Sequence, residues 1–121
     1  YAPDFSQNLG RRMENTAANQ LAKLTENDQL LNVYYWKDYQ RHEVDFVLRR
    51  QEEVTQLIQV CFVSDGEAIP DREVKSLVKA ANQFDCQNLL LLTWNKEANI
   101  KVAGLTIKCQ PLFRWLLLYP K

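Results

Sequence analysis

The chain has 121 residues, of which 46% are apolar and 25% are charged, a composition typical of one globular domain. Its fifteen basic and fifteen acidic side chains cancel, so the net charge indicates neither a nucleic-acid nor a membrane partner. No apolar run approaches the roughly 20 residues that span a bilayer, and no targeting pattern opens the sequence. We therefore expect a soluble protein that does not contact a membrane.

The rare residue types narrow the possible chemistry. The three cysteines, Cys61, Cys86 and Cys109, lack the spacing of a metal or redox motif, so we expect reduced thiols in a cytoplasmic protein. A single histidine, His42, excludes a multi-histidine metal site and argues against a hydrolase triad. We expect it to be an exposed side chain at the end of a strand. The three glycines are isolated, which excludes a P-loop and a dinucleotide fingerprint.

The first predicted element is an amphipathic helix over residues 6–25, with Ser6 as its N-cap. Its apolar stripe consists of Leu9, Met13, Ala17, Leu21 and Leu24. Glu14 falls at the rim of this stripe. Its carboxylate is either solvated or reaches toward the surface on which the helix packs.

Three strands joined by short polar turns are predicted next, which favours an antiparallel meander. They cover residues 31–36, 42–49 and 54–63. Alternation in the second strand places Val44, Phe46 and Leu48 on one face and Asp45 on the other. On the third strand Gln59 and Cys61 stand two residues apart. With a turn of three or five residues, Asp45 lies opposite Gln59 on the same face of the sheet, whereas a slip of one residue separates them.

The second half of the chain reads as helix, strand, hairpin and helix. These elements are expected over residues 70–84, 88–94, 99–102 with 106–109, and 111–119. The nearly continuous apolar run at residues 88–94 indicates a central strand buried on both faces. We expect it to run parallel to a strand of the meander, because a helix connects them. The fold class is therefore α/β.

The order α-β-β-β-α-β resembles the core of the PD-(D/E)XK nuclease-like, or restriction-endonuclease-like, fold. Several stretches are more closely similar to a C-terminal domain of unknown function carried by many prokaryotic AAA-type ATPases. They are residues 10–15, 33–36, 42–47, 57–62 and 72–77. The similarity covers about residues 9–118 and extends to the final strand and helix. It implies a mixed central sheet with a C-terminal hairpin and short helix, and one domain over residues 1–121 that belongs to a larger ATPase.

The same resemblance assigns roles to four residues. Active members of the nuclease superfamily hold Mg²⁺ with an acidic residue and the Glu of a Glu-x-Lys pair, while the Lys orients the attacking water. Asp45 matches the acidic ligand, and Glu14 matches a helix glutamate that some members add. Gln59 stands in place of the Glu and weakens cation binding, because the amide is neutral. Cys61 stands in place of the Lys and cannot supply a positive charge.

Two hypotheses follow for function. The first is a catalytically degenerate nuclease-like module, without a cofactor, that contacts a protein or nucleic acid and its upstream ATPase domain. The alternative is a nuclease that uses Mg²⁺ or Mn²⁺ at Glu14 and Asp45, with a migrated basic group from Arg72 or Lys75. If they do not serve as the migrated basic group, Arg72 and Lys75 simply lie on the solvent-exposed face of their helix. Asp45 itself can serve only the fold, paired with backbone N–H groups or Arg49, in which case the chain is a plain α/β domain.

Overall fold

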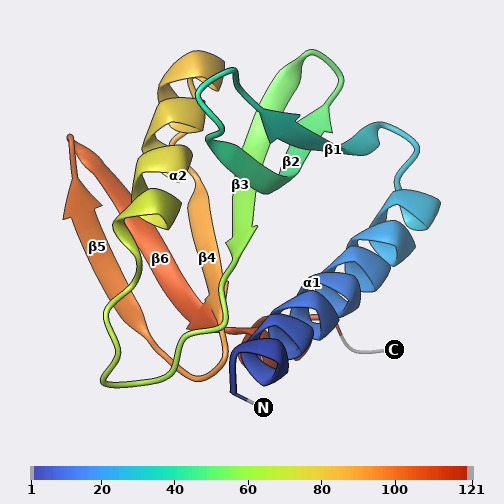
Figure 1. Cartoon of the computed structure of the whole chain (residues 1–121). Helices are drawn as coiled ribbons and strands as arrows, with labels where there is room; N and C mark the ends of the chain where they lie inside the picture. The colour runs from blue at the N-terminus through green and yellow to red at the C-terminus, as the bar shows by residue number, and fades with distance from the viewer. Residues whose placement is uncertain (1, 120–121) are drawn as a thin grey trace.

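The structure is a computed structural model that describes the backbone of residues 2–119 and the side chains of residues 7–119. It contains three helices and one six-stranded sheet within the described residues (Figure 1). In chain order the elements are α1 (Ala2–Asn27), β1 (Leu31–Lys37), β2 (Glu43–Arg50), β3 (Glu53–Val60), α2 (Asp71–Phe84), β4 (Leu89–Thr93), β5 (Ala98–Val102), β6 (Leu105–Pro111) and α3 (Leu112–Leu116).

The sheet is mixed, with the strand order β1-β2-β3-β4-β6-β5. The first three strands form the predicted antiparallel meander. Helix α2 then carries the chain to β4, which pairs parallel to β3 as the sequence indicates. Strand β6 adds parallel to β4, and β5 closes that side as an antiparallel edge. The α/β class, the helix crossover and the C-terminal hairpin are therefore confirmed.

Helices cover both faces of the sheet and create two apolar cores. Helix α2 packs on one face, where its Leu77, Ala80 and Ala81 join Leu57, Leu89 and Leu91 of the strands. Helices α1 and α3 pack on the opposite face, where Met13, Ala17, Leu21 and Trp115 meet Ile58, Leu90 and Leu92. Every residue of β4 is buried, since this central strand has helices on both sides.

The element boundaries differ from the sequence predictions in three places. Helix α1 begins at Ala2, so Ser6 lies inside the helix and is not its N-cap. A proline in the first turn, here Pro3, permits this early start, because the first helical N–H groups have no partner in the helix. Strand β3 ends at Val60 instead of residue 63, and α3 spans only Leu112–Leu116. None of the helices within residues 2–119 has the length and apolar character of a membrane span.

The side chains of β2 also do not alternate between the two faces of the sheet as the sequence predicts. Val44 and Val47 point into the core under α2, whereas Phe46 and Leu48 point into the core under α1. The cause is a bulge, because three residue steps on β2 face only two on β1: Trp36 is opposite Val44, and Tyr34 is opposite Val47. Val44 and Phe46 therefore do not share a face. Asp45 sits inside this bulge.

Candidate functional site

The bulge brings Asp45 to the point where β2 and β3 stop pairing through their backbones. The last backbone pair before this point joins Phe46 and Ile58, so Asp45 comes opposite Gln59. The sequence predicts this pairing for a turn of three or five residues; the turn has only two, and a bulge beside Leu48 and Arg49 supplies the one-residue shift that brings Asp45 opposite Gln59. Their side chains do not project from one face as a pair of ligands would, because both are hydrogen-bonded to the backbone of the neighbouring strand.

Three hydrogen bonds close the space between the strands. The backbone N–H of Asp45 donates to Oε1 of Gln59 at 2.8 Å, and Nε2 of Gln59 donates to the carbonyl oxygen of Glu43 at 2.8 Å. In the other direction, the backbone N–H of Val60 donates to Oδ2 of Asp45 at 2.8 Å. The Gln59 side chain, only 2% exposed, thus replaces a peptide group of β3. We refer to Asp45 and Gln59 with these three bonds as the side-chain seal.

Carboxyl groups from three elements surround Asp45. Burial is the main reason that its pKa rises from the usual 3.8 to about 7, although the hydrogen bond from Val60 opposes the rise. The negative charges of Glu14 on α1, Glu73 on α2 and Glu43 on β2 raise the pKa further. The pKa of Glu73 is itself raised, chiefly by burial. Burial and the neighbouring carboxylates therefore disfavour the ionised form of the Asp45 carboxyl group.

Cys61 does not supply the positive charge of the lysine that the resemblance implies at this position. Burial, followed by the negative charge of Glu73, raises the pKa of its thiol to about 12. The thiol is consequently protonated and neutral at physiological pH, as the sequence predicts. The backbone N–H of Cys61, directly after the end of β3, donates to the carbonyl oxygen of Leu92 on β4 at 2.9 Å, so the backbone of Cys61 faces β4.

The residues of the seal do not fit a divalent cation. Mg²⁺ and Mn²⁺ require several oxygens that are free to coordinate. The amide oxygen of Gln59 already accepts the N–H of Asp45, and one carboxylate oxygen of Asp45 accepts the N–H of Val60. Across the part of the chain that the structure describes, no three histidine, cysteine, aspartate or glutamate side chains lie close enough to hold a metal.

Two of the three basic residues of α2 contact the loop between β1 and β2. Nη2 of Arg72 lies 3.4 Å from the carbonyl oxygen of Arg41, and Nζ of Lys79 lies 2.7 Å from Oδ2 of Asp38. Lys75 is exposed. The hydrogen bond of Arg72 thus attaches the loop to α2, and it does not bring the guanidinium to Asp45.

The loop contains an ion-pair cluster that sequence reasoning missed. Nδ1 of His42 lies 3.2 Å from Oδ2 of Asp38, and His42 is half-buried, so its expected exposure is wrong. Burial alone raises the pKa of Asp38, but hydrogen bonds from Lys79 and His42 outweigh it and lower the pKa to about 2. The four-residue spacing of Asp38 and His42 across a tight loop is the only sequence signal of this contact.

The charged neighbours of Asp45 are not the ones that the sequence predicts. Arg49 does not pair with Asp45, because its guanidinium bonds to the carbonyl oxygen of Gln51 at 3.0 Å and to Glu52 at 3.2 Å. Sequence reasoning missed Glu43 and Glu73, which approach Asp45 only through the register of the strands and the placement of α2. The backbone partner expected for Asp45 is present, in the form of Val60.

Comparison with known proteins places the chain in a family. Residues 9–110 match the family described as Domain of unknown function (DUF4143), and this match covers most of the chain and all four residues singled out above. No curated protein and no solved structure matches the chain at a significant level. The chain therefore belongs to the DUF4143 family of domains of unknown function.

Proposed function

We propose that this domain is a degenerate PD-(D/E)XK nuclease-like module that binds a protein or nucleic acid without cutting it, within a larger AAA-type ATPase. The order of α1, β1, β2, β3, α2 and β4 supports the fold assignment, since it matches the α-β-β-β-α-β core. Exposed aromatic side chains, which are common at interfaces, support a binding role. They include Tyr34, Tyr35, Tyr39, Trp94 and Phe113.

One observation carries the proposal: both polar atoms of the Gln59 side-chain amide are hydrogen-bonded to the backbone of β2. A nuclease of this class needs ligands at these positions that point toward bound phosphate and metal. In this chain the equivalent atoms of Gln59 accept from Asp45 and donate to Glu43. The residue that would hold a cation instead holds two strands together.

The test is a titration of the purified domain with Mg²⁺ and Mn²⁺ by calorimetry, followed by cleavage assays on single- and double-stranded DNA and RNA. We expect no cation binding at millimolar affinity and no cleavage. Asp45→Asn is the matched control, because the amide oxygen can still accept the N–H of Val60 while the charge is removed.

Metal-dependent cleavage that disappears in Asp45→Asn would overturn the proposal in favour of an active nuclease based on Glu14 and Asp45. Fluorescence anisotropy with the same labelled oligonucleotides then separates the two binding roles. Binding without cleavage assigns a nucleic-acid partner, whereas an absence of binding directs the search to a protein partner.

A further inference from the structure

The two edge strands of the sheet differ in how well they are protected against pairing with a strand from another chain. Edge strand β5 has five residues, and its half-buried positions alternate with exposed polar ones, Asn99 and Lys101. Edge strand β1 has seven residues and contains neither glycine nor proline. Two aromatic side chains on it are strongly exposed, Tyr34 at 49% and Tyr35 at 59%. Natural edge strands are usually shortened, charged or interrupted. Strand β1 is long, its single charged residue, Lys37, stands at its end, and its pairing with β2 is irregular only between Tyr34 and Trp36.

The backbone of β1 has a free row of hydrogen-bonding groups. The carbonyl oxygen of Leu30 accepts from the N–H of Gln51, just after β2, and the N–H of Asp38 donates to the carbonyl oxygen of His42, just before β2. Even-numbered positions of β1 therefore face β2. Alternation then points the N–H and carbonyl groups of the odd-numbered positions away from the sheet. These positions are Leu31, Val33, Tyr35 and Lys37. The N–H of Leu31 already donates to the carbonyl oxygen of Asp28 at 3.1 Å, so an added strand can pair with Val33, Tyr35 and Lys37 and with the carbonyl oxygen of Leu31.

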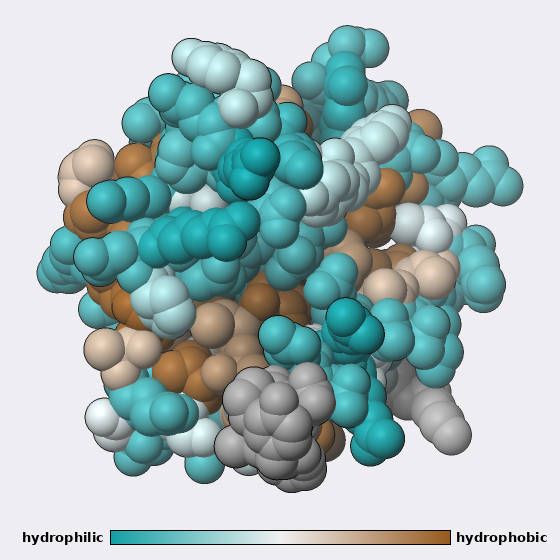
Figure 2. Space-filling model, in the orientation of Figure 1, coloured by the Kyte–Doolittle hydropathy of each residue, from teal (hydrophilic) through white to brown (hydrophobic). Residues whose placement is uncertain are grey.

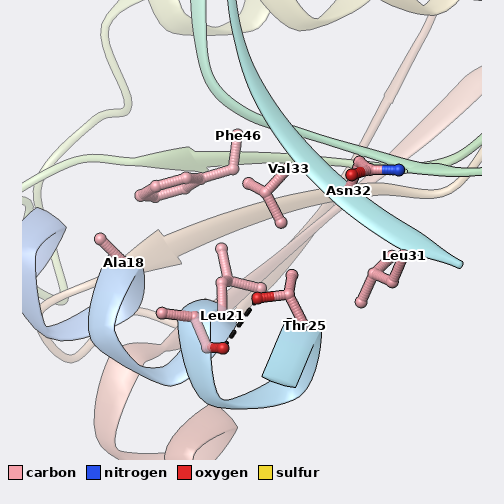
Figure 3. Close-up of a pocket in the computed structure, with 8 residues that line it drawn as sticks. Ala18, Leu21, Thr25, Leu31, Asn32, Val33 and Phe46 are labelled. Carbon is pink, nitrogen blue, oxygen red and sulfur yellow. Dashed lines mark hydrogen bonds between the residues drawn. The ribbon is translucent and has the colours of Figure 1, made fainter. Parts of the chain in front are cut away.

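A groove runs beside β1 on each face of the sheet. On the α1 side a groove of about 370 Å³ is lined by Ala18, Leu21 and Thr25 of α1 and by Leu31, Val33 and Phe46 of the strands (Figure 3). Figure 2 shows apolar surface between β1 and the C-terminal end of α1. On the α2 side a groove of about 220 Å³ is lined by Tyr34, Trp36, Arg49 and Phe84, among others. Side chains of an added strand alternate between the two faces and would fall next to both grooves.

We propose that β1 pairs antiparallel with β1 of a second copy of this chain, about a twofold axis at Tyr34. This register places Val33 of one copy opposite Tyr35 of the other, so that outward-facing positions meet and exchange hydrogen bonds. The two Tyr34 side chains meet at the axis on the α2 side, where aromatic pairs across strands are favourable. The two sheets then become one continuous sheet.

Charge complementarity favours a second copy over an unrelated peptide. Lys37 closes β1 and is exposed, and its odd-numbered position places it on the α1 side together with Leu31 and Val33. Glu26 is exposed in the last turn of α1, near the start of β1. Neither residue has an ion-pair partner within residues 7–119. In the proposed register Lys37 lies opposite Leu31 of the second copy and next to Glu26 of that copy. Because the dimer is twofold symmetric, this Lys37–Glu26 ion pair forms twice.

The experiment is sedimentation velocity and light scattering of the 121-residue chain at concentrations up to about 100 µM. We expect a reversible dimer. Tyr34→Lys places two like charges at the axis and should abolish the dimer, while circular dichroism verifies that the half-exposed position tolerates the change. Lys101→Glu on the opposite edge is the matched control and should leave the dimer unchanged.

A charge swap tests the register. Lys37→Glu and Glu26→Lys should each weaken dimerisation about ten-fold, because each loses two exposed ion pairs, and the double variant should restore it. A monomer at every concentration overturns the proposal. A dimer that Tyr34→Lys leaves intact, or one that the double variant does not restore, equally overturns it. The proposal is also overturned if the chain is monomeric and β1 binds a different protein instead.

Discussion

Strand β3 is joined to its two neighbours in different ways. Toward β4 it pairs through backbone groups over four successive residues, from Leu57 with Leu89 to Val60 with Leu92. Toward β2 the backbone pairing ends at Ile58, and the side chains of Asp45 and Gln59 continue it. The first junction tolerates any side chain that packs, whereas the second depends on the identity of two polar residues. The difference indicates that these two residues extend the junction of β2 and β3 beyond its backbone pairs, which run from Arg50 with Glu53 to Phe46 with Ile58.

The largest effect is expected from Gln59→Glu, which replaces the side-chain amide with a carboxyl group. An ionised carboxylate at this position cannot donate to the carbonyl oxygen of Glu43, and it adds a negative charge beside Asp45. We expect a loss of about 4 kcal/mol in the free energy of unfolding at pH 8. A protonated carboxyl group has one donor and one acceptor, as the amide uses here, so the loss should shrink toward pH 4. Urea denaturation at both pH values measures it.

Gln56→Glu is the matched control on the same strand. Gln56 is partly exposed, and its Nε2 makes only a long contact of 3.4 Å with Asn88. The same change in charge should therefore cost less than about 0.5 kcal/mol at either pH. If the two substitutions had equal effects, the seal would have no special contribution to stability.

A smaller effect is expected from Gln59→Leu, which removes the amide without adding charge. The buried N–H of Asp45 and carbonyl oxygen of Glu43 then lose their partner, at a cost of about 3 kcal/mol that does not vary with pH. Cys61→Ala tests the other junction of β3. It should cost only about 1 kcal/mol, because the bond from Cys61 to Leu92 uses the backbone. Comparable losses measured by urea denaturation would contradict the contrast between the junctions.

The seal should also make stability depend on pH in an unusual direction. The pKa of Asp45 is raised to about 7 in the folded state, so folding takes up a proton between pH 4 and pH 7. Stability should fall as pH rises through this range and level off above it, by about 2 kcal/mol after screening by solvent. Asp45→Asn should remove this part of the slope. A stability curve identical in both proteins would show that Asp45 does not carry the protonation.

The sequence predicts most of the fold because periodicity reports burial. The fully apolar run of β4 and the helical spacing of α2 place both elements correctly, and the connection between them requires a parallel pair. The start of α1 is missed because Ser6 is typical of an N-cap, although Phe5 continues the four-residue spacing of Leu9 and Met13 toward the N-terminus. The bulge at Asp45 is missed because alternation assumes that every strand residue is paired.

The candidate site is predicted only in part. Asp45 and Gln59 lie opposite each other as predicted, but through a two-residue turn and a bulge beside Leu48 and Arg49, not through the expected turn of three or five residues. The roles of their side chains do not follow from the residue types. A glutamine can ligate a cation or replace a peptide group, and only the positions of Asp45 and Glu43 decide between these roles. The cluster of Asp38, His42 and Lys79 joins a loop to a helix far along the chain, which no local pattern reports.

The smallest effect concerns the rim of the same junction, where the hydroxyl of Tyr35 donates a hydrogen bond to Glu43. This bond and the adjacent negative charges raise the pKa of Tyr35 to about 12. Tyr35→Phe should cost about 0.5 kcal/mol or less, since the pair is exposed. Ultraviolet titration is the more sensitive measurement. In Glu43→Gln the titration of Tyr35 should move back toward the ordinary value of about 10, because the accepting charge is gone. Tyr34→Phe, which removes the hydroxyl of the neighbouring tyrosine, identifies the Tyr35 signal by leaving it unchanged. If the Tyr35 titration did not move in Glu43→Gln, Glu43 would contribute to the junction through its backbone carbonyl alone.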